Sequence, residues 1–145
     1  MSLDEMARDR GMAYGIFRLA LGINILIHGA GRIFGQGVVG FAAKTAEEFG
    51  ATALPHWAVY GFLLAVPFIE AALGSLLTLG LFTRWALVAG GLLMIGLIFG
   101  TAMRSDWPTV GIQMIYSITY FLLLFYRRHN VFSVDSLVTR SRVRA

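Results

Sequence analysis

Two ionisable side chains lie inside apolar stretches of the sequence, where they could handle protons. Glu70 lies between Val66 and Gly74, and Arg18 lies in the first apolar stretch. A charged group within a bilayer is costly and marks a functional site unless it is paired or neutral. We interpret Glu70 and Arg18 as candidate catalytic residues for proton transfer. The competing interpretation is that Glu70 forms a structural ion pair or is a hydrogen-bonded neutral acid. For Arg18 there are two possibilities: its side chain reaches Glu70, or it extends to the membrane surface.

A second polar group lies nearer the far end of the first apolar stretch. Asn24, His28 and Arg32 follow one another at four-residue spacing, which places them on one face of a helix. We predict that His28 and Arg32 line a polar pocket, which would suit a quinone carbonyl or another polar head group. Asn24, on the same face, and Tyr116, in the last apolar stretch, are further candidate ligand-binding residues.

Haem is a less favoured ligand than quinone. His28 and His56 could in principle supply two imidazoles to a b-type haem, but His56 is expected in a loop. The sequence has no cysteine, which excludes disulfides and cysteine-ligated clusters. We expect no metal site, because no dense cluster of histidines and carboxylates is visible.

The composition requires a bilayer around these residues. Hydrophobic residues make up 57% of the 145 residues and charged residues 14%, with a mean hydropathy of +0.71. A soluble domain has about 25% charged residues. Apolar blocks span approximately residues 12–33, 57–82, 85–103 and 110–126, each near the roughly 20 residues that a membrane-spanning helix needs. We predict an all-α membrane protein, a single domain over residues 1–145 that forms a four-transmembrane-helix bundle.

The distribution of basic residues predicts the orientation of the bundle. The net charge of +4 comes from residues that flank the apolar blocks, so we expect contact with the lipid bilayer and not with nucleic acid. We predict a multi-pass protein of the cell inner (plasma) membrane, with both termini and the tail 127–145 cytoplasmic. The basic residues on the expected cytoplasmic side are Arg8, Arg10, Arg84, Arg127, Arg128, Arg140, Arg142 and Arg144.

The first connection, about residues 34–56, is the only long one. Residues 41–49 form a plausible amphipathic helix in which Lys44 and Glu48 are four residues apart. Gly50 and Pro55 follow it. We therefore expect a short amphipathic helix in the first extracytoplasmic loop, lying as a cap on the outer membrane surface.

Small and polar residues in the blocks indicate how the helices pack. Small residues allow close approach between membrane helices. In the fourth block Gln113, Tyr116 and Tyr120 share one face, which should point into the bundle. The small residues are Gly15 and Gly22 in the first block, Ala71 and Gly74 in the second, and Gly90, Gly91, Gly96 and Gly100 in the third.

The order of these motifs resembles the DoxX family of small four-span membrane proteins. Residues 18–32 contain Arg-x-x-x-Gly followed by His-Gly-x-x-Arg, residues 70–74 read Glu-x-x-x-Gly, and residues 79–84 read Leu-Gly-Leu-Phe-Thr-Arg. Residues 133–135, Ser-Val-Asp, are similar to the family's Ser-Leu-Asp ending. Val134 replaces the usual leucine, and residues 127–130 replace a glycine-rich approach.

The resemblance implies a role beside redox enzymes. The family takes its name from a membrane subunit linked to thiosulfate:quinone oxidoreductase and terminal quinol oxidase complexes. The resemblance implies that this chain is an integral membrane subunit associated with quinone-linked redox chemistry in a respiratory or sulfur-oxidising complex. The alternative is a non-catalytic scaffold or assembly subunit; both imply protein partners or a homo-oligomer. A small transporter is less favoured, because no inverted repeat is visible. The chain has no flavin or nicotinamide fingerprint, so whether it is itself an enzyme stays open.

Overall fold

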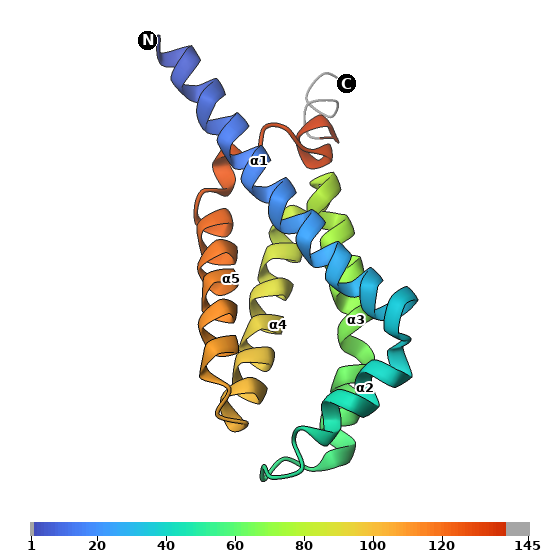
Figure 1. Ribbon diagram of the computed structural model, residues 1–145. Coiled ribbons are helices and arrows are strands. Elements are labelled where there is room, and N and C mark those ends of the chain that lie inside the picture. Colours follow the sequence, from blue (N-terminus) through green and yellow to red (C-terminus); the bar gives the residue numbers. More distant parts are fainter. Residues whose placement is uncertain (1, 139–145) are drawn as a thin grey trace.

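The computed structural model describes residues 2–138, and within them every regular element is a helix. The prediction of an all-α protein is confirmed. Arg140, Arg142 and Arg144, which contributed to the predicted orientation, lie outside the described residues. The helices are α1 (Leu3–Ala30), the π-helical turn η1 (Gly31–Gln36), α2 (Val38–Glu47), α3 (His56–Leu79), α4 (Thr83–Met103), α5 (Trp107–Phe125) and the short η2 (Arg127–His129) (Figure 1).

Four helices in the described chain are long and apolar enough to cross a membrane, as predicted. They are α1 with its extension η1, α3, α4 and α5. The first helix begins at Leu3, well before the apolar block that marks its span. Its start is fixed by a capping box, in which the Ser2 hydroxyl accepts a hydrogen bond from the Glu5 amide at 3.2 Å. Hydropathy therefore located the span, but capping chemistry sets the end of the helix.

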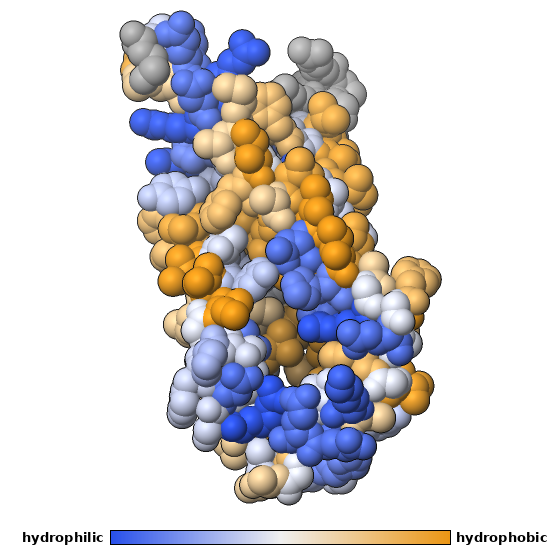
Figure 2. Space-filling model, viewed as in Figure 1, coloured by the Kyte–Doolittle hydropathy of each residue, from blue (hydrophilic) through white to orange (hydrophobic). Residues whose placement is uncertain are grey.

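The helices form a loose bundle in which α1 crosses the others obliquely (Figure 1). Helices α4 and α5 lie side by side, and α2 packs against the first half of α3 through Ala42 and Ala46. The start of α1 and the segment after α5 lie at one end of the bundle. Figure 2 shows a hydrophobic surface between hydrophilic ends, interrupted by a hydrophilic patch and a hollow in its lower half.

Helices α1 and α3 cross with their backbones in contact. A Cβ atom on Gly74 would lie 2.3 Å from the Leu26 amide nitrogen, and one on Gly29 would lie 2.4 Å from that of Ala71. A Cβ on Gly22 would meet α3 at 2.6 Å. The predicted close approach is confirmed for Gly22, Ala71 and Gly74, and Gly29 adds a contact that the sequence did not suggest. This crossing fixes the register between the two helices.

Helices α4 and α5 meet through a glycine and a tyrosine. The Tyr120 ring packs against Gly90 so closely that a Cβ there would lie 2.2 Å from Tyr120 Cε1. Tyr120 is buried, and Gln113 donates a hydrogen bond from Nε2 to Thr101 Oγ1 at 3.0 Å. The polar face of α5 therefore points into the bundle, as expected.

The residues after α5 fold back on the turn between α3 and α4. The Asp135 carboxylate accepts hydrogen bonds from the Phe82 and Thr83 amides, both at 2.8 Å. The Asp135 amide donates to the Gly80 carbonyl at 3.0 Å, and Asn130 Nδ2 donates to Thr83 Oγ1 at 3.1 Å. A carboxylate at a helix N-terminus satisfies free amides and interacts favourably with the helix dipole. Through Asn130 and Asp135, the described part of the tail is therefore packed against the bundle.

Candidate functional site

The crossing of α1 and α3 brings Glu70 beside Arg32. Glu70 lies on α3 and is 3% exposed, and its Oε2 accepts a hydrogen bond from Arg32 Nη1 in an ion pair. Arg32 lies in the π-helical turn η1, where the wider winding changes the direction of each side chain relative to an α-helix. Its guanidinium also lies over the Phe41 ring of α2, 4.7 Å from the centroid. The pair thus joins α1, α2 and α3.

The predicted ligand-binding residues gather around this pair. Asn24, His28 and Arg32 line a cavity of about 470 Å³, open to the surface, together with Gln36 and other residues of the first connection. The Tyr116 hydroxyl donates a hydrogen bond to Asn24 Oδ1 at 3.0 Å, which links α5 to α1. Asn24, His28 and Arg32 therefore line one cavity. Tyr116 is not among its lining residues and is connected to it by the hydrogen bond to Asn24, and Glu70 is connected to it by the ion pair with Arg32.

Arg18 belongs to a different cluster. It is 4% exposed, and its guanidinium donates hydrogen bonds to the carbonyl oxygens of Leu77, Thr78 and Phe132, the last two at 3.1 and 2.9 Å. The predicted contact with Glu70 is wrong, because Arg18 faces the last turn of α3, about 10 Å further along that helix. Extension to the membrane surface is also wrong. Arg18 instead ties α1 to the end of α3 and to the tail.

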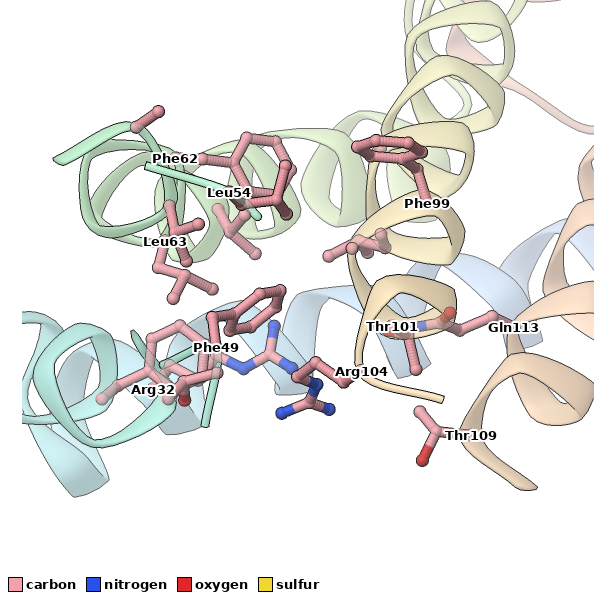
Figure 3. A pocket seen from close by; sticks show the side chains of 18 residues that line it. Arg32, Phe49, Leu54, Phe62, Leu63, Phe99, Thr101, Arg104, Thr109 and Gln113 are labelled. Carbon is pink, nitrogen blue, oxygen red and sulfur yellow. Dashed lines mark hydrogen bonds between the residues drawn. The ribbon is translucent and has the colours of Figure 1, made fainter. Parts of the chain in front are cut away.

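Behind Arg32 lies a second cavity of about 390 Å³, between α2, α3, α4 and the start of α5 (Figure 3). Leu54, Phe62 and Phe99 line one side of it, opposite Arg32 and Arg104. Gly96 and Gly100 lie in its wall. These glycines were interpreted as packing residues; they receive the rings of Phe62 and Phe49 at ordinary contact distances or slightly closer.

Arg104, which follows the last residue of α4, also lines this cavity, and no sequence motif indicates that it belongs to a site. Its guanidinium makes ion pairs with Glu48 and, at 3.4 Å, with Asp106. Hydrogen bonds from the Thr109 side chain and amide lower the pKa of the Asp106 carboxyl. Asp106 therefore keeps its charge, caps α5 and holds Arg104 in place.

Two residues of the cavity lining each carry a buried side-chain atom that has no hydrogen-bond partner within residues 2–138. The two atoms are Arg104 Nε, a donor, and Gln113 Oε1, an acceptor. Buried polar atoms are normally paired, so an unpaired donor and an unpaired acceptor on two residues of one cavity wall favour a polar ligand or water beside them. The charges of Arg32 and Arg104 are already balanced by carboxylates, which favours an uncharged ligand with both carbonyl and hydroxyl groups.

The two histidines of the haem hypothesis, His28 and His56, lie on different helices, α1 and α3. His28 lines the cavity of about 470 Å³. The expectation that His56 lies in a loop is wrong, because His56 is the first residue of α3 and its ring stacks on Tyr60 with the ring centroids 6.1 Å apart. Within residues 2–138, no group of three or more histidines and carboxylates is positioned to hold a metal ion.

The family assignment follows from a comparison with protein-family models. The DoxX model matches residues 13–103, which contain most of α1 and all of α2, α3 and α4. The chain belongs to the DoxX family. Arg18, Arg32 and Glu70 lie in the matched part of this DoxX protein, whereas Gln113, Tyr116 and the tail lie beyond it. No curated protein and no solved structure matches the chain.

Proposed function

We propose that this DoxX protein is an integral membrane subunit associated with quinone-linked redox chemistry, and that the cavity between α2, α3 and α4 binds the quinone head group. One observation carries the proposal. A cavity with aromatic walls is lined by Arg104 and Gln113, each of which carries a buried side-chain atom without a hydrogen-bond partner among the described residues, and by Arg32 of the Glu70–Arg32 pair.

The size and walls of the cavity suit such a ligand. Small-molecule sites typically enclose about 300–1,000 Å³ and are mostly apolar with a few placed polar groups; this cavity has about 390 Å³. Phe62 and Phe99 line it while also being exposed on the outer surface of the bundle, at 39% and 58%. A lipophilic molecule therefore has an entrance from the bilayer.

In this proposal Arg104 and Gln113 bind the quinone head group, and Glu70 binds and releases a proton. A bound quinone would supply two-electron, two-proton redox chemistry, and in this proposal a partner protein exchanges the electrons. Arg104 Nε can donate a hydrogen bond to a carbonyl oxygen, and Gln113 Oε1 can accept one from a hydroxyl. Glu70 Oε2 can hold a proton, and Arg32 connects it with the outer cavity that His28 lines. In this proposal Arg18 has a structural role only.

A scaffold or assembly subunit is the second candidate, and α5 favours it. Only Tyr120 and Leu123 of this helix are buried in the bundle. Its outer face is apolar and available to another membrane protein or to a second copy of the chain. The exposed residues on this helix include Ile112, Ile115, Ile118, Phe121 and Phe125.

Quinone retention separates the two candidates. The protein would be purified in a mild detergent, and quinone extracted from it would be quantified per chain. We expect near-stoichiometric quinone in the wild type and about tenfold less in Glu70→Gln, because Arg32, which lines the cavity, loses the carboxylate that balances its charge. Gln113→Leu removes the proposed acceptor and should retain about fivefold less. Glu47→Gln, the same change on the exposed face of α2, should retain the wild-type amount.

Quinone at the detergent background in the wild type would overturn the redox proposal. The scaffold candidate would then lead, and co-purifying chains cross-linked through α5 would be its test. Equal quinone in Glu70→Gln, Gln113→Leu and Glu47→Gln would also reject this cavity as the site.

A further inference from the structure

A third cavity lies at the opposite end of the bundle, between α1 and α5. It has a volume of about 620 Å³. Arg10, Arg128 and His129 surround its outer part, and Ala13 and Phe17 are among the residues that line it deeper along α1. We infer that this groove binds an anionic phospholipid, with the phosphate beside the two arginines and an acyl chain against the apolar residues.

Two contacts build the groove. The Tyr14 hydroxyl donates a hydrogen bond to the Leu123 carbonyl at 2.9 Å, which joins α1 to α5 at the floor. The tail lies so close to α1 that a Cβ on Gly11 would be 2.5 Å from Val131 Cγ2. This approach holds η2, and with it Arg128, on the same cavity as Arg10. The groove is therefore a fixed feature of the packed helices and tail.

Among the described residues, no carboxylate forms an ion pair with the arginines of the groove. Within residues 2–138, neither Arg10 nor Arg128 makes an ion pair, and no Asp or Glu lines the groove. Arg128 uses Nε to donate to His129 Nε2 at 3.2 Å, which leaves its other nitrogens available. Guanidinium groups bind phosphate oxygens with paired hydrogen bonds. This site differs from the quinone cavity, where both arginines are balanced by carboxylates.

The position of the charges indicates a lipid. Arg10 lies just before the apolar part of α1, and Arg128 lies three residues after α5 ends at Phe125, so both are at the boundary of the membrane. Figure 2 shows hydrophilic residues gathered over the start of α1, with hydrophobic surface below them. Phe17 is 41% exposed, so the apolar part of the groove borders the bilayer.

The predicted orientation adds a reason for an anionic head group. Basic pockets between membrane helices on the cytoplasmic side bind anionic lipid head groups. This end of the bundle is the one that the basic flanks predict to be cytoplasmic. The inference shares no residue with the proposed quinone cavity and does not depend on it.

Lipid binding can be measured on the purified full-length chain by native mass spectrometry. Delipidated protein would be titrated with phosphatidylglycerol and, separately, with phosphatidylcholine. We expect at least tenfold tighter binding of phosphatidylglycerol to the wild type. The double variant Arg10→Gln/Arg128→Gln should lose roughly 30-fold, at about fivefold per arginine. Arg8→Gln/Arg84→Gln removes two positive charges from the same end outside the groove and should bind as the wild type does.

A second variant tests the apolar part without changing charge. Ala13→Phe fills the groove at an exposed position of α1 and should weaken phosphatidylglycerol binding by about tenfold. Glycerol phosphate at millimolar concentration should not displace the lipid, because it lacks acyl chains. Equal binding of the two lipids, equal loss in both double variants, or displacement by glycerol phosphate would overturn the inference.

Discussion

A single methyl group at Gly74 should destabilise the bundle, whereas the same group at Gly61 should not. Both glycines lie within α3. A Cβ on Gly74 would lie 2.3 Å from the Leu26 nitrogen and 2.5 Å from its Cα, whereas a Cβ on Gly61 would have no atom within 4 Å. The atoms that block Gly74 belong to the backbone of α1, so no rotation of a side chain makes room.

Comparing the two variants isolates the cost of the clash. Alanine is favoured over glycine in a helix by about 1 kcal/mol, and this gain applies to both positions. Overpacking typically costs about 1–3 kcal/mol. Relief at Gly74 requires α1 and α3 to separate by roughly 1 Å to restore ordinary contact, which places the cost at the upper end of that range. Gly74→Ala should therefore be about 2–3 kcal/mol less stable than Gly61→Ala.

Reversible unfolding in mixed micelles, titrated with sodium dodecyl sulfate, gives the free energy of unfolding of each variant. Tryptophan fluorescence from the three tryptophans and helical circular dichroism should report the same transition. Gly74→Ala with a stability equal to that of Gly61→Ala would refute the close crossing. The geometry that brings Arg32 to Glu70 would then need to be redrawn.

Two further predictions concern the tail and the orientation. Asp135→Ala should lower the free energy of unfolding by about 1–2 kcal/mol, because the Asp135 carboxylate caps α4. Asp9→Ala, which removes an exposed carboxylate of α1, should change the free energy of unfolding by less than about 0.5 kcal/mol. Equal effects of the two changes in the same titration would show that the cap does not contribute. Because the natural chain has no cysteine, Asp4→Cys should resist a membrane-impermeant thiol reagent in intact cells and Ala51→Cys should react; the reverse labelling would invert the predicted topology.

The four spans and the amphipathic helix were predictable because bilayer length and helical periodicity leave a strong signal in hydropathy. The site was only partly predictable. The i, i+4 spacing of Asn24, His28 and Arg32 correctly placed them together, because a helix preserves that spacing. The partner of Glu70 depends on which residues lie at the α1–α3 crossing. Gly29 is the residue of α1 that indicates the position of this crossing, because it is small and lies three residues before Arg32.

The errors have identifiable physical causes. The sequence suggests a carboxylate partner for Arg18, but backbone carbonyl oxygens can accept the hydrogen bonds of a buried guanidinium equally well. Every residue has a backbone carbonyl, so such a partner leaves no signal in the sequence. Arg104 belongs to no sequence motif that would indicate a site. Its place in a cavity depends on the turn before α5 and on Glu48, which is distant in sequence. The start of α1 was missed because the capping residues Ser2 and Glu5 lie in a polar segment.

The contact between Arg18 and the tail also has a consequence for biosynthesis. The Phe132 carbonyl that accepts a hydrogen bond from Arg18 lies 114 residues later in the chain. During translation, the first helix therefore enters the bilayer with a buried cation whose acceptors do not yet exist. The carbonyls of α3 become available first, and the last acceptor arrives only when the fourth span has left the ribosome. Docking of the tail is thus the closing step of assembly, and a chain truncated after α5 would expose an incompletely satisfied arginine to membrane quality control.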